Sequence, residues 1–182
     1  MKKIITLVIV AFITVNVTAQ EINWVSLEEA LELQKKNPKK IMMDVYTNWC
    51  GPCKKLDKYT FGNKDVAEYI NKHYYAVKFN GEGNEKIRYN DKDFENPNYK
   101  PERAKTRNSP HQLTRYFGVR AYPSLIFIDE EQQFLTVIRG YKNPQQIELY
   151  LKLFKQDLHK DLTTQEAFNE YYETFVPEFK SK

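Results

Sequence analysis

Two spacings of apolar residues organise this chain. Runs with an apolar residue at every third or fourth position predict helices, and short, nearly continuous apolar runs predict buried strands. The helical pattern covers residues 27–37, 52–61, 66–72, 109–117, 144–154 and 163–175. The strand pattern covers residues 40–46, 75–80, 125–129 and 134–139. Helices and strands that alternate in this way predict an α/β fold, in which helices cover both faces of a central sheet.

Polar residues mark the ends of several predicted elements. Ser26 with Glu29, and Thr163 with Glu166, have the spacing of a capping box, in which two residues satisfy each other's backbone amides at a helix start. The polar turn at residues 130–133 joins the last two predicted strands into a hairpin.

Residues 81–109 interrupt this alternation. The stretch is rich in Asn, Lys, Glu, Asp and Pro, is nearly free of aliphatic residues and shows no sustained period. A loop of this length inside a compact domain is uncommon and is usually functional or disordered. It carries Tyr89, Phe94 and Tyr99 amid charged residues, so it is a recognition surface or a mobile loop, and we favour recognition.

The N-terminus has the pattern of a secretory signal peptide. Two lysines precede an apolar run over residues 4–15, and small and polar residues follow up to Ala19. This run of twelve residues is shorter than the roughly 20 that a spanning helix needs, although an uncleaved anchor is the alternative. We expect residues 1–19 to be cleaved after Ala19, and the mature protein to be periplasmic or secreted, without stable membrane insertion.

The charge balance argues against two classes of partner. The formal net charge of +4 includes two lysines and no acids in residues 1–19, so the mature chain carries +2. Near-neutrality with interspersed signs does not suggest a protein that binds nucleic acid or a membrane surface. The remaining length suits a single domain, and we place its boundaries at residues 20–160, followed by a C-terminal helical extension over 161–182.

The only two cysteines of the chain, Cys50 and Cys53, lie three positions apart. Half of a zinc site would need two more ligands, and the three histidines are scattered without metal-site spacing. A structural disulfide across two residues would close almost no loop and would therefore stabilise little. Two inert buried thiols are the remaining alternative, and we favour a redox-active pair.

The residues around the cysteines resemble the thioredoxin superfamily. The similarity covers roughly residues 22–158 apart from the insertion, and segment 43–61 also resembles the C-terminal domain of DsbD-type transmembrane electron transporters. It implies a thioredoxin fold, in which helices flank a central mixed sheet. This chain departs from the family in the long polar insertion before the expected cis-proline, residues 81–109, and in the extra C-terminal helix from Thr163. The matching positions are Trp49-Cys50-Gly51-Pro52-Cys53-Lys54, Asp44, Asp57, Lys78, Pro123 and Gly140.

The resemblance assigns chemistry to three of these residues. Cys50, partly exposed at a helix start, would be the nucleophile, because backbone amides there favour its thiolate. Cys53 would resolve the mixed disulfide. Asp44 would exchange a proton with Cys53, its pKa raised by burial; the alternative is a structural acid, paired for instance with Lys78. Lys78 is more typical of a strand residue whose side chain extends to solvent than of a catalytic group. Asp57 is either a second tuning acid or part of the ordinary helix surface.

Other positions would receive the substrate. Trp49 either contacts the substrate or simply packs, and Gly51-Pro52 between the cysteines resembles the reducing branch of the superfamily. The bond between Tyr122 and Pro123 should be cis, which would let the backbone of Tyr122 pair with an extended substrate, although an ordinary trans proline is the alternative.

These expectations combine into one function. We expect an exported thiol–disulfide oxidoreductase that reduces disulfides of protein substrates and needs no metal or organic cofactor. Its electrons would come from a membrane donor. The alternatives are a disulfide oxidase or isomerase, and an adaptor with a thioredoxin fold whose role is to bind a partner.

Overall fold

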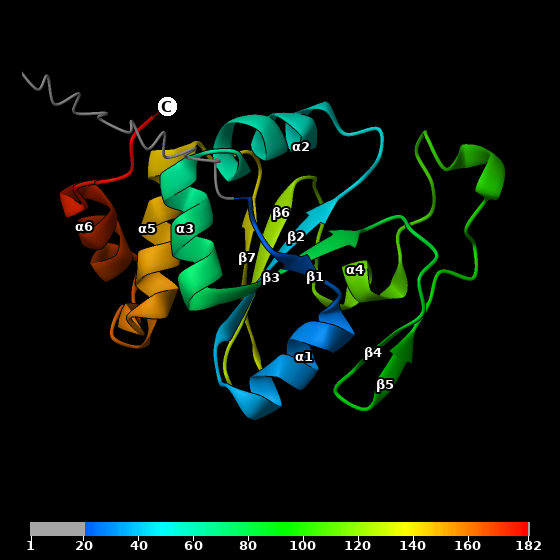
Figure 1. Ribbon diagram of the computed structural model, residues 1–182, viewed down its shortest axis with the longest axis horizontal. Coiled ribbons are helices and arrows are strands. Elements are labelled where there is room, and N and C mark those ends of the chain that lie inside the picture. The colour runs from blue at the N-terminus through cyan, green and yellow to red at the C-terminus, as the bar shows by residue number, and fades with distance from the viewer. Residues whose placement is uncertain (1–20, 182) are drawn as a thin grey trace, which may run out of the picture.

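A computed structural model describes residues 21–181 of the chain (Figure 1). The expected signal peptide, residues 1–19, lies outside the described residues. Within the described part, no helix has the length and apolar character needed to cross a membrane.

A five-stranded mixed sheet forms the centre of the fold, in the order β1-β3-β2-β6-β7. Strands β1, β3 and β2 are parallel, whereas β6 is antiparallel to both β2 and β7. The expected α/β fold with a mixed sheet is therefore confirmed. The strands are β1 (Trp24–Val25), β2 (Lys40–Tyr46), β3 (Tyr74–Asn80), β6 (Ser124–Ile128) and β7 (Phe134–Arg139).

Helices cover both faces of this sheet, because β2 is apolar on both sides. Ile41, Met43 and Val45 join the cluster under α1 and α4, and Met42 joins the cluster under α3, α5 and the helical segment η1. Since side chains alternate along a strand, Asp44 lies on the same face as Met42. The helices are α1 (Leu27–Lys36), α2 (Gly51–Lys55), α3 (Lys64–His73), α4 (Gln112–Tyr116), α5 (Pro144–Lys155) and α6 (Gln165–Thr174), and η1 (Leu56–Phe61) continues α2 as a π-helix.

The insertion has secondary structure that its sequence pattern does not reveal. β4 (Ile87–Tyr89) and β5 (Lys92–Phe94) form an antiparallel hairpin whose turn residues, Asn90 and Asp91, have φ values of 48° and 57°. Ile87, Tyr89 and Phe94 are buried in the cluster under α1 and α4. The expectation of a recognition surface or a mobile loop is wrong for Tyr89 and Phe94, because the hairpin buries both side chains. Strands of three residues are too short to establish a period in the sequence.

Helix starts differ from the predictions by a few residues. α4 begins at Gln112, where His111 accepts the Leu113 amide proton, rather than at residue 109. The last helix is capped by Thr164 and not by Thr163. The only reciprocal capping box in the described helices pairs Asn143 with Gln146, at the start of the helix predicted over residues 144–154.

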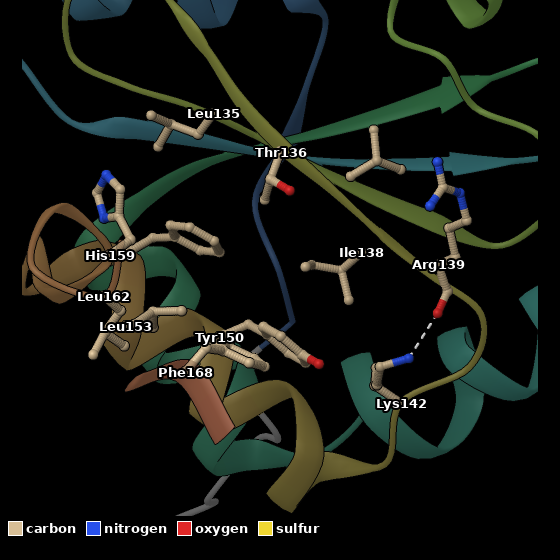
Figure 2. Close-up of a pocket in the computed structure, with 12 residues that line it drawn as sticks. Leu135, Thr136, Ile138, Arg139, Lys142, Tyr150, Leu153, His159, Leu162 and Phe168 are labelled. Atoms are coloured by element: carbon tan, nitrogen blue, oxygen red, sulfur yellow. Dashed lines mark hydrogen bonds between the residues drawn. The ribbon is translucent and has the colours of Figure 1, made fainter. Parts of the chain in front are cut away.

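The C-terminal helix is present and packs on α5. A cavity of about 520 Å³ remains between β7, α5 and α6, and its lining includes Ile138, Tyr150 and Phe168 (Figure 2). Beyond α6, Phe179 returns to the core cluster of α3 and α5. The buried carboxylate of Glu148 accepts hydrogen bonds from two backbone amides of this returning segment, which fastens the extension to the domain.

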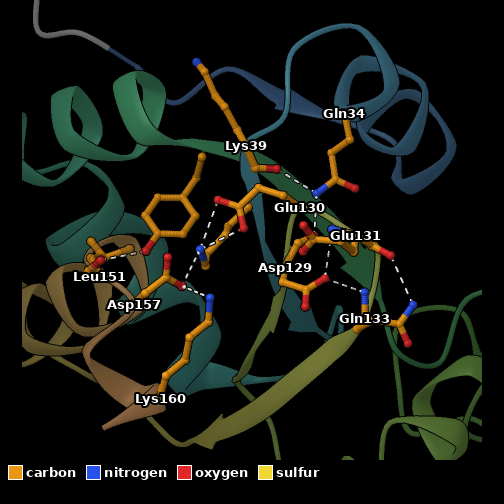
Figure 3. Close-up of polar contacts among 11 residues, drawn as sticks. Gln34, Lys39, Asp129, Glu130, Glu131, Gln133, Leu151, Asp157 and Lys160 are labelled. Atoms are coloured by element: carbon orange, nitrogen blue, oxygen red, sulfur yellow. Dashed lines mark hydrogen bonds and ion pairs between the residues drawn. The ribbon is translucent and has the colours of Figure 1, made fainter.

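A buried lysine at the start of β2 contacts one acid in the turn after β6 and one acid just after α5. Figure 3 labels these two acids, Glu130 and Asp157. The side chain of Lys40 is 2% exposed, and its Nζ lies 2.8 Å from Glu130 Oε2 and 2.9 Å from Asp157 Oδ1. Burial lowers the pKa of Lys40, but the two carboxylates outweigh burial and the net shift is upward. This network lies at the end of β2 remote from the cysteines.

Candidate active site

The two cysteines form a disulfide where β2 gives way to α2. Their Cα atoms lie 5.3 Å apart, within the usual range for a disulfide. Cys50 is the N-cap of α2, and the Cys53 amide donates a hydrogen bond to Cys50 Sγ over 3.1 Å. Pro52 lies in the first turn, where the amide that it lacks has no helical partner.

Both cysteines are only 2% exposed, so the expectation of a partly exposed Cys50 is wrong for this oxidised form. The bond to Cys53 explains the difference, because it holds Cys50 Sγ against a side chain that faces the core. Gly51 and Pro52 between them are exposed, so the turn itself is open to solvent.

Asp44 lies on β2 and is completely buried. Lys78 is its neighbour on β3, and Lys78 Nζ lies 2.9 Å from Asp44 Oδ2. This is the distance of an ion pair, but neither oxygen of Asp44 has a partner with hydrogen-bond geometry in the described structure. Lys78 also pairs with Asp57 on η1, so the lysine links a buried acid to one that is 44% exposed. Lys78 thus makes the pairing with Asp44 that the sequence analysis named, while its own side chain remains 23% exposed.

Burial dominates the electrostatics of this cluster. It raises the pKa of Asp44 to about 6, because the opposing attraction of Lys78 is smaller than the cost of desolvating the carboxylate. Burial lowers the pKa of Lys78, but its two acidic partners reverse this and the net shift is upward. Burial thus brings the pKa of Asp44 closer to neutral pH than that of a solvated carboxyl.

Trp49, beside Cys50, is anchored by a residue that the sequence analysis missed. The Trp49 indole Nε1 donates to Glu82 Oε2 over 2.8 Å, and the same oxygen accepts the amide proton of Asn108. Glu82 is buried at the carboxyl end of β3, adjacent to the strand that leads into the cysteines. That position was a usable signal, because parallel sheets gather functional residues at this edge.

The Tyr122–Pro123 peptide bond is cis, which confirms the expectation for this segment. The Tyr122 ring meets the Trp49 ring edge to face, with centroids 6.2 Å apart. Gly81 permits this approach, since a Cβ there would lie 2.7 Å from the Tyr122 ring and 2.9 Å from Val45. The structure thus joins Trp49 and Tyr122 in one cluster, and Asp44, Lys78 and Asp57 in another.

Three comparisons with known proteins agree on the family. A model of the thioredoxin-like domain matches residues 27–155. Disulfide bond reductase DsbH of Chlamydia pneumoniae is 26% identical over 121 residues, which are 66% of this chain and 64% of the relative. Thiol:disulfide interchange protein DsbD of Actinobacillus pleuropneumoniae is 27% identical over 117 residues, which are 62% of this chain. The aligned part spans only 16% of that DsbD protein, so its whole activity does not transfer to this chain.

Solved structures show the same fold. A thioredoxin-fold protein from Helicobacter pylori has a TM-score of 0.54 at 17% identity, covering 75% of this chain and 82% of its own. A DsbH oxidoreductase has a TM-score of 0.50 at 23% identity, with 78% and 87% covered. A candidate disulphide-isomerase from Bacteroides thetaiotaomicron has a TM-score of 0.51 at 27% identity, with 78% and 96% covered.

Proposed function

This chain belongs to the thioredoxin-like domain family, and we propose that it is an exported thiol–disulfide oxidoreductase that reduces protein disulfides. The observation that carries the proposal is the position of Cys50 as the N-cap of α2, with the Cys53 amide donating to its Sγ. In the reduced protein, this hydrogen bond favours the thiolate of Cys50, which is the form that attacks disulfides.

The reaction proceeds in two exchanges. The Cys50 thiolate attacks one sulfur of the substrate disulfide, so that a Cys50–substrate bond forms while the substrate bond breaks and its second sulfur leaves as a thiolate. Cys53 then loses its proton and attacks Cys50 Sγ, which releases the first substrate sulfur as a thiolate. Two electrons pass to the substrate, both thiolates take up protons, and the protein is left with the Cys50–Cys53 disulfide seen here.

Asp44 accepts the proton of Cys53 in this scheme. Its pKa of about 6 lets it hold a proton briefly and return it near neutral pH. Lys78 and Asp57 give that proton a route outward, because both line a hollow that opens beside Trp24. Asp44 and Lys78 therefore act on the resolving step, whereas Trp49, Tyr122 and Pro123 form the surface on which the substrate lies.

The motif and the expected export support the reducing direction. Gly51-Pro52 resembles the reducing branch of the superfamily, and a relative carries the name disulfide bond reductase. An exported reductase must be reduced again after each cycle, and we assign that step to a dithiol donor held in the membrane. Export itself rests on residues 1–19, and N-terminal sequencing of the secreted protein should find Gln20 first.

Trapping tests the assignment of the two cysteines. Cys53→Ser should accumulate mixed disulfides on Cys50, because the resolving thiol is missing, and the matched variant Cys50→Ser should accumulate none. Equal trapping by both variants would refute these roles. The reduction potential of the Cys50–Cys53 pair tests whether the protein reduces or oxidises its substrates. A value of about −270 mV, that of thioredoxin, supports a reductase. A value of about −120 mV would instead support an oxidase.

The adaptor alternative has its own test. A Cys50→Ser/Cys53→Ser double variant keeps the fold and the surface but has no redox activity. The proposal requires that this variant lose the cellular phenotype of the wild-type protein. If the phenotype and partner binding persist, the protein is an adaptor.

A further inference from the structure

The insertion places a charged segment beside the active-site turn. Residues 97–107, which we call the basic arm, contain the short 3₁₀ turn Pro101–Arg103 and lie next to the link between β2 and α2 (Figure 1). The Asn48 side chain donates to Ala104 O over 2.8 Å. The Arg107 guanidinium lies over the Trp49 ring, 4.9 Å from its centroid. The arm therefore contacts the residues that immediately precede Cys50.

The base of the arm is closed by a ladder of hydrogen bonds, so the arm is a built element. Asn108 accepts the amide proton of Lys100 and donates to its carbonyl, over 3.0 and 2.8 Å. Asn96 is buried and donates to Gly83 O and Ser109 O, over 2.9 and 2.7 Å. Glu82 adds a link from the Asn108 amide to Trp49, which ties the arm to the active-site turn at a second point.

The arm carries a net positive charge that its own fold does not neutralise. Its four basic residues are exposed, and its single acid, Glu102, leaves a net charge of +3. Among the described residues, none of these four makes an ion pair with a carboxylate. The four residues are Lys100, Arg103, Lys105 and Arg107.

We propose that the basic arm is a docking surface that selects protein disulfides flanked by acidic residues. The inference rests on the proposed function, since it names the substrate class of that same site. A substrate whose cysteine reaches Cys50 must pass Trp49, and the residues beside that cysteine then meet the arm. Guanidinium groups pair with carboxylates in a bidentate manner, and Arg107 is held ready by its stacking on Trp49.

Matched peptide disulfides test the selection. Three peptides share one sequence and differ only near the cysteine, where they carry four Glu, four Gln or four Lys residues. At low ionic strength, the reduced wild-type protein should reduce the Glu peptide about tenfold faster in kcat/KM than the Gln peptide, and the Lys peptide more slowly still. The Glu preference should shrink to about twofold or less in 0.5 M salt, where screening acts within about 4 Å.

A charge-matched pair of variants assigns the preference to the arm. Arg103→Gln/Lys105→Gln removes two positive charges from the arm, and its Glu-over-Gln ratio should fall to about twofold. Lys36→Gln/Lys155→Gln removes two exposed charges from the far ends of α1 and α5, and should keep the tenfold ratio. A ratio that falls equally in both variants, or in neither, would overturn the role of the arm.

Failure of the inference can be told apart from failure of the proposed function. If the wild-type protein reduces all three peptides and the uncharged 2-hydroxyethyl disulfide at similar rates, the function stands and the docking surface does not. If it reduces none of them, the proposed reductase activity itself is refuted.

Discussion

Replacing Asp44 by Asn should stabilise the protein at neutral pH and leave its stability in acid nearly unchanged. The substitution keeps the shape of the side chain but removes its ionisation. Asp44 is fully buried, and burial raises its pKa from 3.8 to about 6. At about 1.4 kcal/mol per pKa unit, this shift means that ionised Asp44 destabilises the folded state by about 3 kcal/mol.

The sign and the pH window follow from linkage. A carboxyl whose folded pKa is raised contributes stability below its unfolded pKa of 3.8 and loses that contribution as the pH rises through about 6. Wild-type protein loses this stability across the window, whereas Asp44→Asn has no such proton to lose. The difference in the free energy of unfolding between the variant and wild type should therefore grow by about 2 kcal/mol from pH 4.5 to pH 8, and should stay constant above pH 8.

Urea unfolding of the oxidised proteins, at intervals from pH 4.5 to 8, measures this difference. Asp57→Asn is the matched control, because Asp57 contacts the same lysine from a half-exposed position. Its effect on the free energy of unfolding should stay below about 1 kcal/mol at every pH. A difference between Asp44→Asn and wild type that does not vary with pH, or a variant less stable at pH 8, would refute the electrostatic reasoning.

Three further predictions concern other parts of the structure. Gly81→Ala should lower the free energy of unfolding by about 1–3 kcal/mol, since its Cβ would overlap the ring of Tyr122. Gly51→Ala, with no atom within 4 Å of its Cβ, should change that free energy by less than about 1 kcal/mol. Equal effects of the two substitutions in urea unfolding would contradict this prediction. Lys40→Met should cost about 1–3 kcal/mol at pH 7 because two carboxylates lose their buried partner, and an unchanged urea midpoint would show that they rehydrate freely. Glu82→Ala should shift the fluorescence of Trp49 and slow disulfide reduction severalfold. Glu82→Gln keeps a hydrogen-bond acceptor for the Trp49 indole and should have smaller effects on both. Identical behaviour of the two variants would exclude the anchoring role of Glu82.

The sequence predicted those parts of the fold in which a pattern persists over several residues. β2 is apolar at nearly every position because both of its faces are covered, and this run was readable without the structure. The hairpin of the insertion was not, since its strands have three residues each and only Ile87, Tyr89 and Phe94 among them are buried. Its burial depends on α1 and α4, which are distant in sequence, and no local period records that contact.

The site shows the same division. The pairing of Cys50 with Cys53 follows from their spacing in the sequence, and the cis bond at Pro123 was predicted through the family resemblance. The pairing of Lys78 with Asp44 depends on the register of β2 against β3, which the sequence suggested only through a family resemblance. The position of Glu82 just after β3 was a usable signal for its contact with Trp49, but its second contact, with the Asn108 amide, depends on how the insertion folds back, and no local pattern specifies that.

The cost of burying Asp44 is itself an argument about function. Asn at this position would remove the penalty of about 3 kcal/mol. A gain of that size is a large fraction of the free energy of unfolding of a typical domain. A purely structural acid paired with Lys78 has no reason to retain the penalty. A proton acceptor for Cys53 does, because only an ionisable group can take up and return the proton. The two accounts separate in one measurement: Asp44→Asn should slow the release of substrate from a Cys50 mixed disulfide while leaving its formation unchanged. If both rates match those of wild type, Asp44 is structural and its burial remains without a catalytic reason.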